Sequence, residues 1–262
     1  MTMTYRGTTA LITGASAGLG AEFAEQFAAR GADLVLVARR EDRLRELAGR
    51  LASRYGITAT PIALDLARPD AAADLRRALE LRGIVVQTLV NNAGFGMKGA
   101  FVDADAERTA QMVQVNVAAL VAITREFLPD LVADGRGALV NIASSAAYQP
   151  CPSMAVYGAT KAFVLSFTEA LAHETRGSGL RVVAVSPGAT RTEFFDVVGT
   201  EDAAVGRFQT PAQVVSLAVR ELDRRKPRPS VVSGRANALN ARLATLMPRR
   251  LTLAVSGRVL GR

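Results

Sequence analysis

A tyrosine and a lysine, Tyr157 and Lys161, lie four residues apart in an apolar, alanine-rich segment. In a helix this spacing places both side chains on one face, close enough to interact. Because an ammonium group stabilises a neighbouring phenolate, the pair predicts a lowered tyrosine pKa and a group that exchanges protons with a substrate oxygen. The same spacing also arises between unrelated surface neighbours, so the pair needs support from the rest of the chain.

A glycine-rich turn near the start of the chain is the second feature with a chemical use. Gly14, Gly18 and Gly20 follow a short apolar run and precede a helical pattern. Glycine lets a pyrophosphate approach the backbone, and the free N–H groups of the helix start bind its charge. The spacing differs from the commoner Gly-x-Gly-x-x-Gly, so a purely structural turn is the alternative. The position between a strand and a helix favours a dinucleotide site.

The residues after the second apolar run indicate which dinucleotide binds. NAD-binding proteins usually place an acid there to hold the ribose hydroxyls, whereas this chain has Arg39 and Arg40. A guanidinium binds a 2′-phosphate through paired, charge-assisted hydrogen bonds, and Ser16 offers a nearby hydroxyl donor. The sequence therefore predicts NADP(H). The alternative is a solvated charged turn, since further charged residues follow.

The elements that must position these residues alternate between strand and helix. Runs of leucine and β-branched residues predict strands that are covered on both faces. They lie at residues 8–13, 33–38, 58–64, 88–91, 138–143, 180–186 and 230–233. Helical patterns predict helices at residues 21–30, 41–55, 70–81, 103–134, 155–176 and 211–225. We expect Pro129 to bend or end the longest of them.

Strict alternation with short connections predicts a doubly wound α/β domain, with parallel strands and helices on both faces. No linker precedes about residue 226, so we expect one Rossmann-type domain over residues 1–235 and a C-terminal extension over residues 236–262. Ligands bind such sheets at the carboxyl ends of the strands, which is where the motifs above lie.

Composition and charge narrow the class of protein. The chain is 49% apolar and 21% charged, and no apolar run reaches the length of a membrane span. A single cysteine, Cys151, excludes an internal disulfide and fits a reducing compartment, so we expect a cytoplasmic protein without a secretory leader. No cluster of His, Cys, Asp and Glu suggests a metal.

The formal net charge of +8 is a property of the C-terminal end. Residues 220–262 hold eleven Arg or Lys and two acids, whereas the rest of the chain is close to neutral. We interpret this end as solubilising; anionic lipid, an acidic substrate tail and nucleic acid are the alternatives, nucleic acid being disfavoured. A predicted helix at 237–247 and an apolar stretch at 251–260 suit contact with a membrane surface, a neighbouring subunit or the active site.

The glycine turn and the Tyr157/Lys161 pair resemble motifs of the short-chain dehydrogenase/reductase family, in its single-domain branch. The resemblance covers about residues 6–235, and Ser144 precedes Tyr157 by the family's usual thirteen residues. The other matching segments are Thr13–Gly20, Asp65-Leu66, Asn91–Gly94, Asn116, and Pro187-Gly188 with Thr192. The resemblance implies a seven-stranded sheet of order 3-2-1-4-5-6-7 and hydride transfer between a nicotinamide and a carbonyl or alcohol.

The resemblance also implies catalytic roles for four residues. Tyr157 would give a proton to the substrate oxygen, and Ser144 would stabilise the charge that grows there. Lys161 would hold the nicotinamide ribose, and Asn116 would position a water that links Lys161 to solvent. Cofactor contacts are implied for Gly14, Ser16, Gly18, Leu19, Gly20, Arg39, Arg40, Asp65, Leu66, Asn92, Ala93, Gly94, Tyr157, Lys161, Pro187, Gly188 and Thr192. As alternatives, Ser145 would be the active hydroxyl, Asn116 a satisfied polar residue, and Asp65 a turn-forming acid.

Substrate specificity in this family lies in the loops after the fifth and sixth strands, here residues 146–154 and 189–210. With the segment after Asn-Asn-Ala-Gly they supply four candidate substrate contacts, namely Phe95, Tyr148, Phe194 and Phe195. This apolar set predicts a hydrophobic ketone, aldehyde or acyl-type substrate. Simple closure of the core over the cofactor is an equally good interpretation.

Two other functions compete with an NADP(H)-dependent carbonyl reductase or alcohol dehydrogenase. The first is a non-catalytic dinucleotide-binding sensor or a nucleic-acid- or membrane-associated protein, against which the complete set of four catalytic residues argues. The second is an epimerase or dehydratase of the extended branch, for which the chain is too short. By resemblance alone we expect a homodimer or homotetramer.

Overall fold

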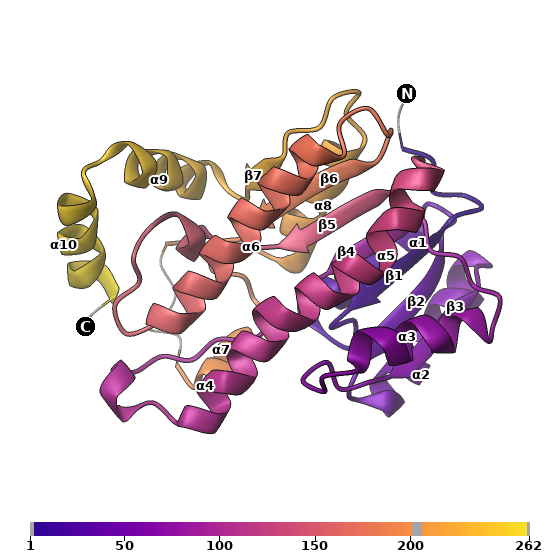
Figure 1. Ribbon diagram of the computed structural model, residues 1–262, viewed down its shortest axis with the longest axis horizontal. Coiled ribbons are helices and arrows are strands. Elements are labelled where there is room, and N and C mark those ends of the chain that lie inside the picture. Colours follow the sequence, from indigo (N-terminus) through magenta and orange to yellow (C-terminus); the bar gives the residue numbers. More distant parts are fainter. Residues whose placement is uncertain (1–2, 201–205, 261–262) are drawn as a thin grey trace.

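The computed structural model describes residues 3–200 and 206–260. Seven strands of this part form one parallel sheet in the order β3-β2-β1-β4-β5-β6-β7 (Figure 1), so the expected topology is confirmed. The strands are β1 Thr9–Thr13, β2 Asp33–Ala38, β3 Ala59–Ala63, β4 Thr88–Asn91, β5 Ala138–Ile142, β6 Arg181–Ser186 and β7 Ser230–Val232.

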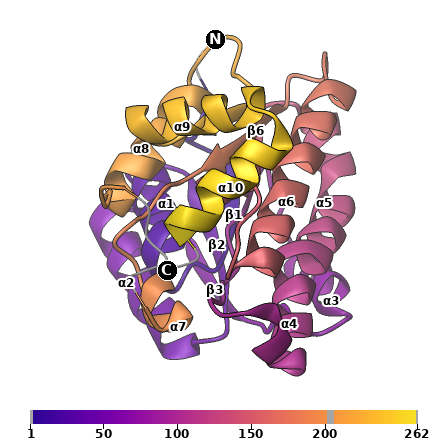
Figure 2. The ribbon, with the colours of Figure 1, turned by 90° about the vertical axis from the view of Figure 1, so that its left-hand side faces the viewer.

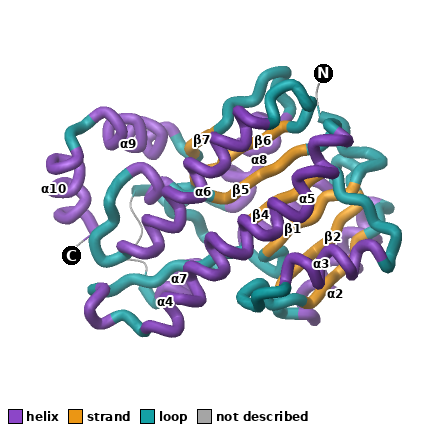
Figure 3. The backbone as a smooth tube through the Cα atoms, in the orientation of Figure 1, coloured by secondary structure: helices purple, strands orange, loops and turns teal. Residues whose placement is uncertain are grey.

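Helices cover both faces of the sheet (Figures 1 and 3), since successive strand side chains point to opposite faces and both sets are apolar. Ala10 and Ile12 pack with α1, α2 and α8, whereas Leu11 packs with α3, α5 and α6. The helices are α1 Gly18–Ala28, α2 Glu41–Tyr55, α3 Ala71–Glu80, α4 Ala106–Val113, α5 Leu120–Asp134, α6 Ala155–Glu174, α7 Phe194–Val198, α8 Pro211–Leu222, α9 Arg235–Leu246 and α10 Arg249–Leu260.

The long helix expected over residues 103–134 is instead three segments in sequence. Helix α4 passes into a π-helical segment at Gln114–Ala119, and α5 follows it. Of the two expected effects of Pro129, an end of the helix is not found, because α5 continues to Asp134. Pro129 is exposed, so the carbonyl that loses its helical hydrogen bond lies on the solvent side, where water can replace the donor.

Two buried asparagines fix the central strands to the helices that carry the site. Asn91 of β4 donates to Asn141 of β5 over 2.9 Å, and the two residues are paired in register. Asn91 also donates to Thr124 of α5, and Asn141 donates to Thr168 of α6, each over 2.9 Å. Buried amides need such partners, so this network fixes α5 and α6 relative to the sheet.

Helices α9 and α10 lie beyond β7 at the edge of the molecule, on the side where the strands end (Figures 1 and 2). Their inward faces include Ala241, Thr252 and Ser256, which are buried. The C-terminal extension therefore forms part of the wall around the carboxyl ends of the strands, together with α4 and α7.

Candidate active site

One cavity of about 790 Å³ opens at the carboxyl ends of the strands. Loops that follow six of the seven strands line it, together with α4, α6, α7 and α9. Of the residues singled out from the sequence, the cavity brings together Gly14, Ser16, Gly18, Leu19, Arg39, Arg40, Asp65, Leu66, Asn92, Ala93, Gly94, Phe95, Ser144, Tyr157, Lys161, Pro187, Gly188, Thr192, Phe194 and Phe195.

The glycine turn is held tightly against the end of β4. A Cβ atom on Gly14 would lie 2.8 Å from Asn92 Nδ2, and one on Gly20 would lie 2.3 Å from the Gly14 carbonyl oxygen. Gly18, with a φ of +55°, begins α1, and its N–H end faces the cavity. Only glycine fits these contacts, and the resulting concave backbone at a helix start suits a pyrophosphate.

Arginine and serine line the far end of this turn. The Arg40 guanidinium donates from Nε and Nη2 to Ser16 Oγ over 3.2 and 3.0 Å, and Arg39 also lines the cavity. This arrangement fits the 2′-phosphate of NADP(H), because it offers a hydroxyl and fixed guanidinium groups together. Asp65 accepts a hydrogen bond from Ala67 N over 3.0 Å and thereby shapes the loop after β3.

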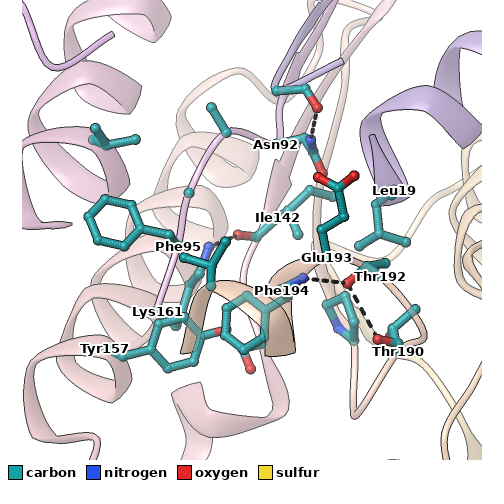
Figure 4. Close-up of a pocket in the computed structure, with 18 of the residues that line it drawn as sticks. Leu19, Asn92, Phe95, Ile142, Tyr157, Lys161, Thr190, Thr192, Glu193 and Phe194 are labelled. Atoms are coloured by element: carbon teal, nitrogen blue, oxygen red, sulfur yellow. Dashed lines mark hydrogen bonds between the residues drawn. The ribbon is translucent and has the colours of Figure 1, made fainter. Parts of the chain in front are cut away.

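At the other end of the cavity lie Tyr157 and Lys161 (Figure 4), and half-buried Ser144 lines the same cavity. Tyr157 and Lys161 are 8% and 6% exposed on one face of α6, as their spacing predicts. Ser144 follows β5 and hydrogen bonds to the Tyr157 hydroxyl. Lys161 Nζ donates to the Ile142 carbonyl at the end of β5 over 2.8 Å. The hydroxyls of Ser144 and Tyr157 and the ammonium of Lys161 thus lie in the same part of the cavity.

Asn116 lies behind this group, outside the cavity lining. Its Oδ1 accepts from Phe95 N over 3.0 Å, and its Nδ2 donates to Phe95 O over 2.9 Å and to Thr160 Oγ1 over 3.1 Å. A Cβ on Gly94 would lie 2.9 Å from Asn116 Oδ1 and 3.5 Å from Lys161 Nζ. Asn116 therefore ties the segment after β4 to α6, next to the lysine. Its π-helical segment, a feature common at functional sites, has no signal in the residue pattern.

Burial controls the protonation of the Tyr157/Lys161 pair. It raises the pKa of Tyr157 to about 12, although the Ser144 hydrogen bond lowers it. Burial also lowers the pKa of Lys161 to about 8. The expected lowering of the tyrosine pKa is thus not found: the ammonium lies 5.9 Å from the centre of the Tyr157 ring and bonds to Ile142 instead. The phenol is a protonated donor at neutral pH.

The end of the cavity beside Tyr157 has an apolar wall. The Phe194 ring lies 5.3 Å from the Tyr157 ring, and Phe95, Cys151 and Met154 pack in the same cluster. Tyr148 lies outside the cavity, contrary to expectation. Its hydroxyl is 3.4 Å from Ser186 Oγ, and its ring packs with the cluster between α5 and α6. Residues 201–205 of the expected substrate loop lie outside the described residues.

Several cavity residues have no signal in the sequence. Arg108 and Gln111 of α4, Glu193 at the start of α7, and Asn237 and Asn240 of α9 add polar groups to the lining. Asn237 is also in contact with Gly188, since a Cβ there would lie 2.1 Å from Asn237 Nδ2. These residues belong to no short motif, and only the folding of distant segments brings them together.

Within the described residues, no group of three or more His, Cys, Asp or Glu could hold a metal ion. Among the described helices, none combines the length and the apolar character that a membrane span requires. Burial raises the pKa of the Cys151 thiol to about 11, so it stays protonated and unreactive at neutral pH.

The low pKa of buried Lys161 gives a testable pH dependence of stability. Its folded pKa of about 8 lies below the usual value of 10.5, so the folded state loses the lysine proton before the unfolded state does. The free energy of unfolding of the wild type should therefore rise relative to that of Lys161→Met, by up to about 1.4 kcal/mol per pH unit, as pH increases from 8 towards 10.5. Urea unfolding at several pH values measures this difference.

The matched control is Lys226→Met, which removes an exposed lysine and should follow the wild-type profile. If the difference in free energy of unfolding between the wild type and Lys161→Met stays constant as pH increases from 8 towards 10.5, the lowered pKa of Lys161 is contradicted.

Comparison with known proteins places this geometry in a family. The model of the short chain dehydrogenase family matches residues 8–203. Sulfoacetaldehyde reductase 2 of Chromohalobacter salexigens is 39% identical over 79% of this chain and 84% of its own length. A short-chain dehydrogenase of Sphingobium yanoikuyae, solved in complex with NADPH, is 38% identical with a TM-score of 0.81, over 95% of both chains.

A solved 7β-hydroxysteroid dehydrogenase is 28% identical with a TM-score of 0.85, over 98% of this chain and all of its own. That match extends into the C-terminal helices, which therefore have counterparts in another protein of this fold. The motif order, the sheet topology, the serine, tyrosine and lysine of the cavity, and these similarities agree. The chain belongs to the short-chain dehydrogenase family and is an oxidoreductase.

Proposed function

We propose that this protein is an NADP(H)-dependent oxidoreductase that transfers hydride between the nicotinamide and a carbonyl or secondary alcohol. The observation that carries the proposal is that buried Tyr157 and Lys161 lie with half-buried Ser144 at one end of a cavity whose other end is the glycine turn. A dinucleotide that spans this cavity would place its reactive ring beside the tyrosine. A non-catalytic sensor would have no need for this complete set.

The charge around the glycine turn favours NADP(H) over NAD(H). Arg40 is anchored on Ser16, and Arg39 lines the same end of the cavity. Each guanidinium attracts a 2′-phosphate, and arginine stands directly after β2, where NAD-binding proteins usually place an acid for the ribose hydroxyls. The NADPH complex of the Sphingobium relative supports this assignment.

The direction that suits the protonation of the site is reduction. When bound, the cofactor supplies hydride to the carbonyl carbon. Tyr157, neutral with a pKa of about 12, gives its proton to the oxygen, which completes the alcohol. Ser144 donates a hydrogen bond that strengthens as negative charge grows on that oxygen. Lys161 holds a positive charge close to the phenol. Asn116 fixes the backbone of Phe95 through two hydrogen bonds.

The wall of the cavity favours a hydrophobic ketone, aldehyde or acyl-type substrate. Phe95, Met154 and Phe194 provide apolar surface beside the Tyr157 hydroxyl, while Gln111 and Asn240 give polar groups to the lining. The relatives differ widely in their named substrates, so the wall, rather than their names, supports this part of the proposal.

We also propose a homodimer or homotetramer built through α5 and α6, where the outer face of α6 exposes Phe163 by 41%. Light scattering on the protein in solution measures the number of subunits in the assembly, and a monomer would contradict this proposal.

The junction of α9 and α10 suits contact with an anionic membrane surface. Leu246 and Leu251 are 74% and 51% exposed there, and Arg249 and Arg250 lie between them. No acid follows Asp223 in the sequence, so the charge of this end is entirely positive. Exposed leucines enter the boundary of the acyl chains, while the arginines beside them bind anionic headgroups. Because a second copy of this end would also be positively charged, the charge favours membrane contact over pairing of two copies.

The catalytic proposal predicts turnover of at least one carbonyl class in an NADPH-oxidation screen over ketones, aldehydes and acyl thioesters. Tyr157→Phe should lower kcat by about 100-fold or more, because the proton donor is lost. Tyr148→Phe is the matched control; it removes a hydroxyl outside the cavity and should keep most of the activity. The proposal fails if no carbonyl gives turnover that depends on Tyr157.

The cofactor proposal predicts a kinetic preference for NADPH over NADH. Arg40→Ala should raise KM for NADPH by about tenfold or more with little change for NADH, and Arg39→Asp should shift the preference towards NADH. Arg45→Ala, on the exposed side of α2, should change neither constant. Equal use of both cofactors by the wild type would count against NADP(H).

The membrane proposal predicts co-flotation with vesicles that contain phosphatidylglycerol but not with pure phosphatidylcholine vesicles. Two variants, Leu246→Ser with Leu251→Ser, and Arg249→Glu with Arg250→Glu, should both abolish flotation because both interactions are needed. Wild-type protein that stays at the bottom of the gradient with either lipid would remove this part of the proposal.

A further inference from the structure

Glu193 is an acid that lines the cavity (Figure 4), and its carboxylate is bound by two arginines. Its Oε2 accepts a hydrogen bond from Arg40 Nη1 over 2.8 Å, and its Oε1 accepts one from Arg43 Nη1. Arg40 donates from its other two nitrogens to Ser16. The carboxylate is thus bound by the same guanidinium that is anchored beside the glycine turn.

The neighbours of Glu193 hold it in this place. The preceding residue, Thr192, is in contact with the glycine turn, since a Cβ on Gly18 would lie 3.1 Å from Thr192 Cγ2. The following residue, Phe194, packs on the Tyr157 ring and donates its backbone N–H to Thr192 Oγ1 over 3.3 Å. Contacts on both sides therefore direct the carboxylate to the arginines, rather than leaving it as a free surface group.

A carboxylate and a phosphate compete for such arginines. Both anions bind a guanidinium through the same pair of N–H groups, and two anions side by side repel each other. The Arg40 and Arg43 guanidinium groups lower the pKa of Glu193, so the carboxylate is charged at neutral pH. A cofactor with a 2′-phosphate must share or displace these bonds, whereas one without it meets no such competitor.

We propose that Glu193 is a specificity-determining residue that competes with the 2′-phosphate of NADP(H) for Arg40 and Arg43. This inference rests on the proposed use of NADP(H). The carboxylate weakens NADP(H) binding without affecting NAD(H), so it narrows the difference in affinity between the two cofactors. The side chains of Glu193, Arg40 and Arg43 are 43%, 43% and 51% exposed, so each ion pair is weak enough for a phosphate dianion to displace it.

The experiment measures binding of adenosine 2′,5′-bisphosphate and of AMP to the full-length protein by calorimetry. The two ligands differ only in the 2′-phosphate, and neither has a nicotinamide, so the result is independent of catalysis. Glu193→Gln should bind the bisphosphate about three- to tenfold more tightly than the wild type, with less than a twofold change for AMP. Asp196→Asn, which removes an exposed acid three residues away, is the matched control and should behave like the wild type.

Three outcomes are decisive. Tighter binding of the bisphosphate to Glu193→Gln alone supports competition. Unchanged or weaker binding to that variant, with wild-type protein still preferring the bisphosphate over AMP, overturns the role of Glu193 and leaves the NADP(H) proposal standing. Wild-type protein that does not prefer the bisphosphate overturns both. Equal melting temperatures of the variants and the wild type confirm that folding is not the cause.

Discussion

The close packing of the glycine turn against the end of β4 is the constraint on which the rest of the site depends. Asn92 Nδ2 donates to the carbonyl oxygens of Thr13 and Gly14 over 2.9 and 3.2 Å, and added Cβ atoms at Gly14 or Gly20 would meet backbone or amide atoms within 3 Å. This contact joins β1 and β4, where the strand order reverses and where an open parallel sheet leaves its ligand crevice. The contact of the glycine turn with Asn92 gives the backbone its concave shape and positions the first turn of α1.

Burial then determines the protonation of Tyr157 and Lys161. The Asn91–Asn141 network fixes α5 and α6 to the central strands, which places Tyr157 and Lys161 under the end of β5. Removal from water opposes charge on both side chains, so the phenol keeps its proton and the ammonium loses its proton more easily. Burial of the pair therefore affects their pKa values more than their spacing along the sequence does.

The segment after β6 connects the two ends of the cavity. Over three consecutive residues it touches the glycine turn through Thr192, Arg40 through Glu193 and the Tyr157 ring through Phe194. The charge beside the glycine turn and the shape of the apolar wall beside Tyr157 thus depend on one stretch of backbone.

The sequence alone determined the alternation of strands and helices, the positions of most elements and the main groups of the cavity, while the sheet order followed from the family resemblance. Apolar runs specify buried parallel strands, and the spacing of glycine, arginine, tyrosine and lysine marks the site before its geometry is known. Tertiary structure decided the rest. It turned residues 114–119 into a π-helical segment, moved Tyr148 out of the cavity, brought Glu193 to Arg40 and placed α9 against the cavity. It also reversed the expected direction of the Tyr157 pKa shift. Contacts between distant segments and the loss of water around a side chain cannot be inferred from local spacing, because both depend on how the whole chain packs.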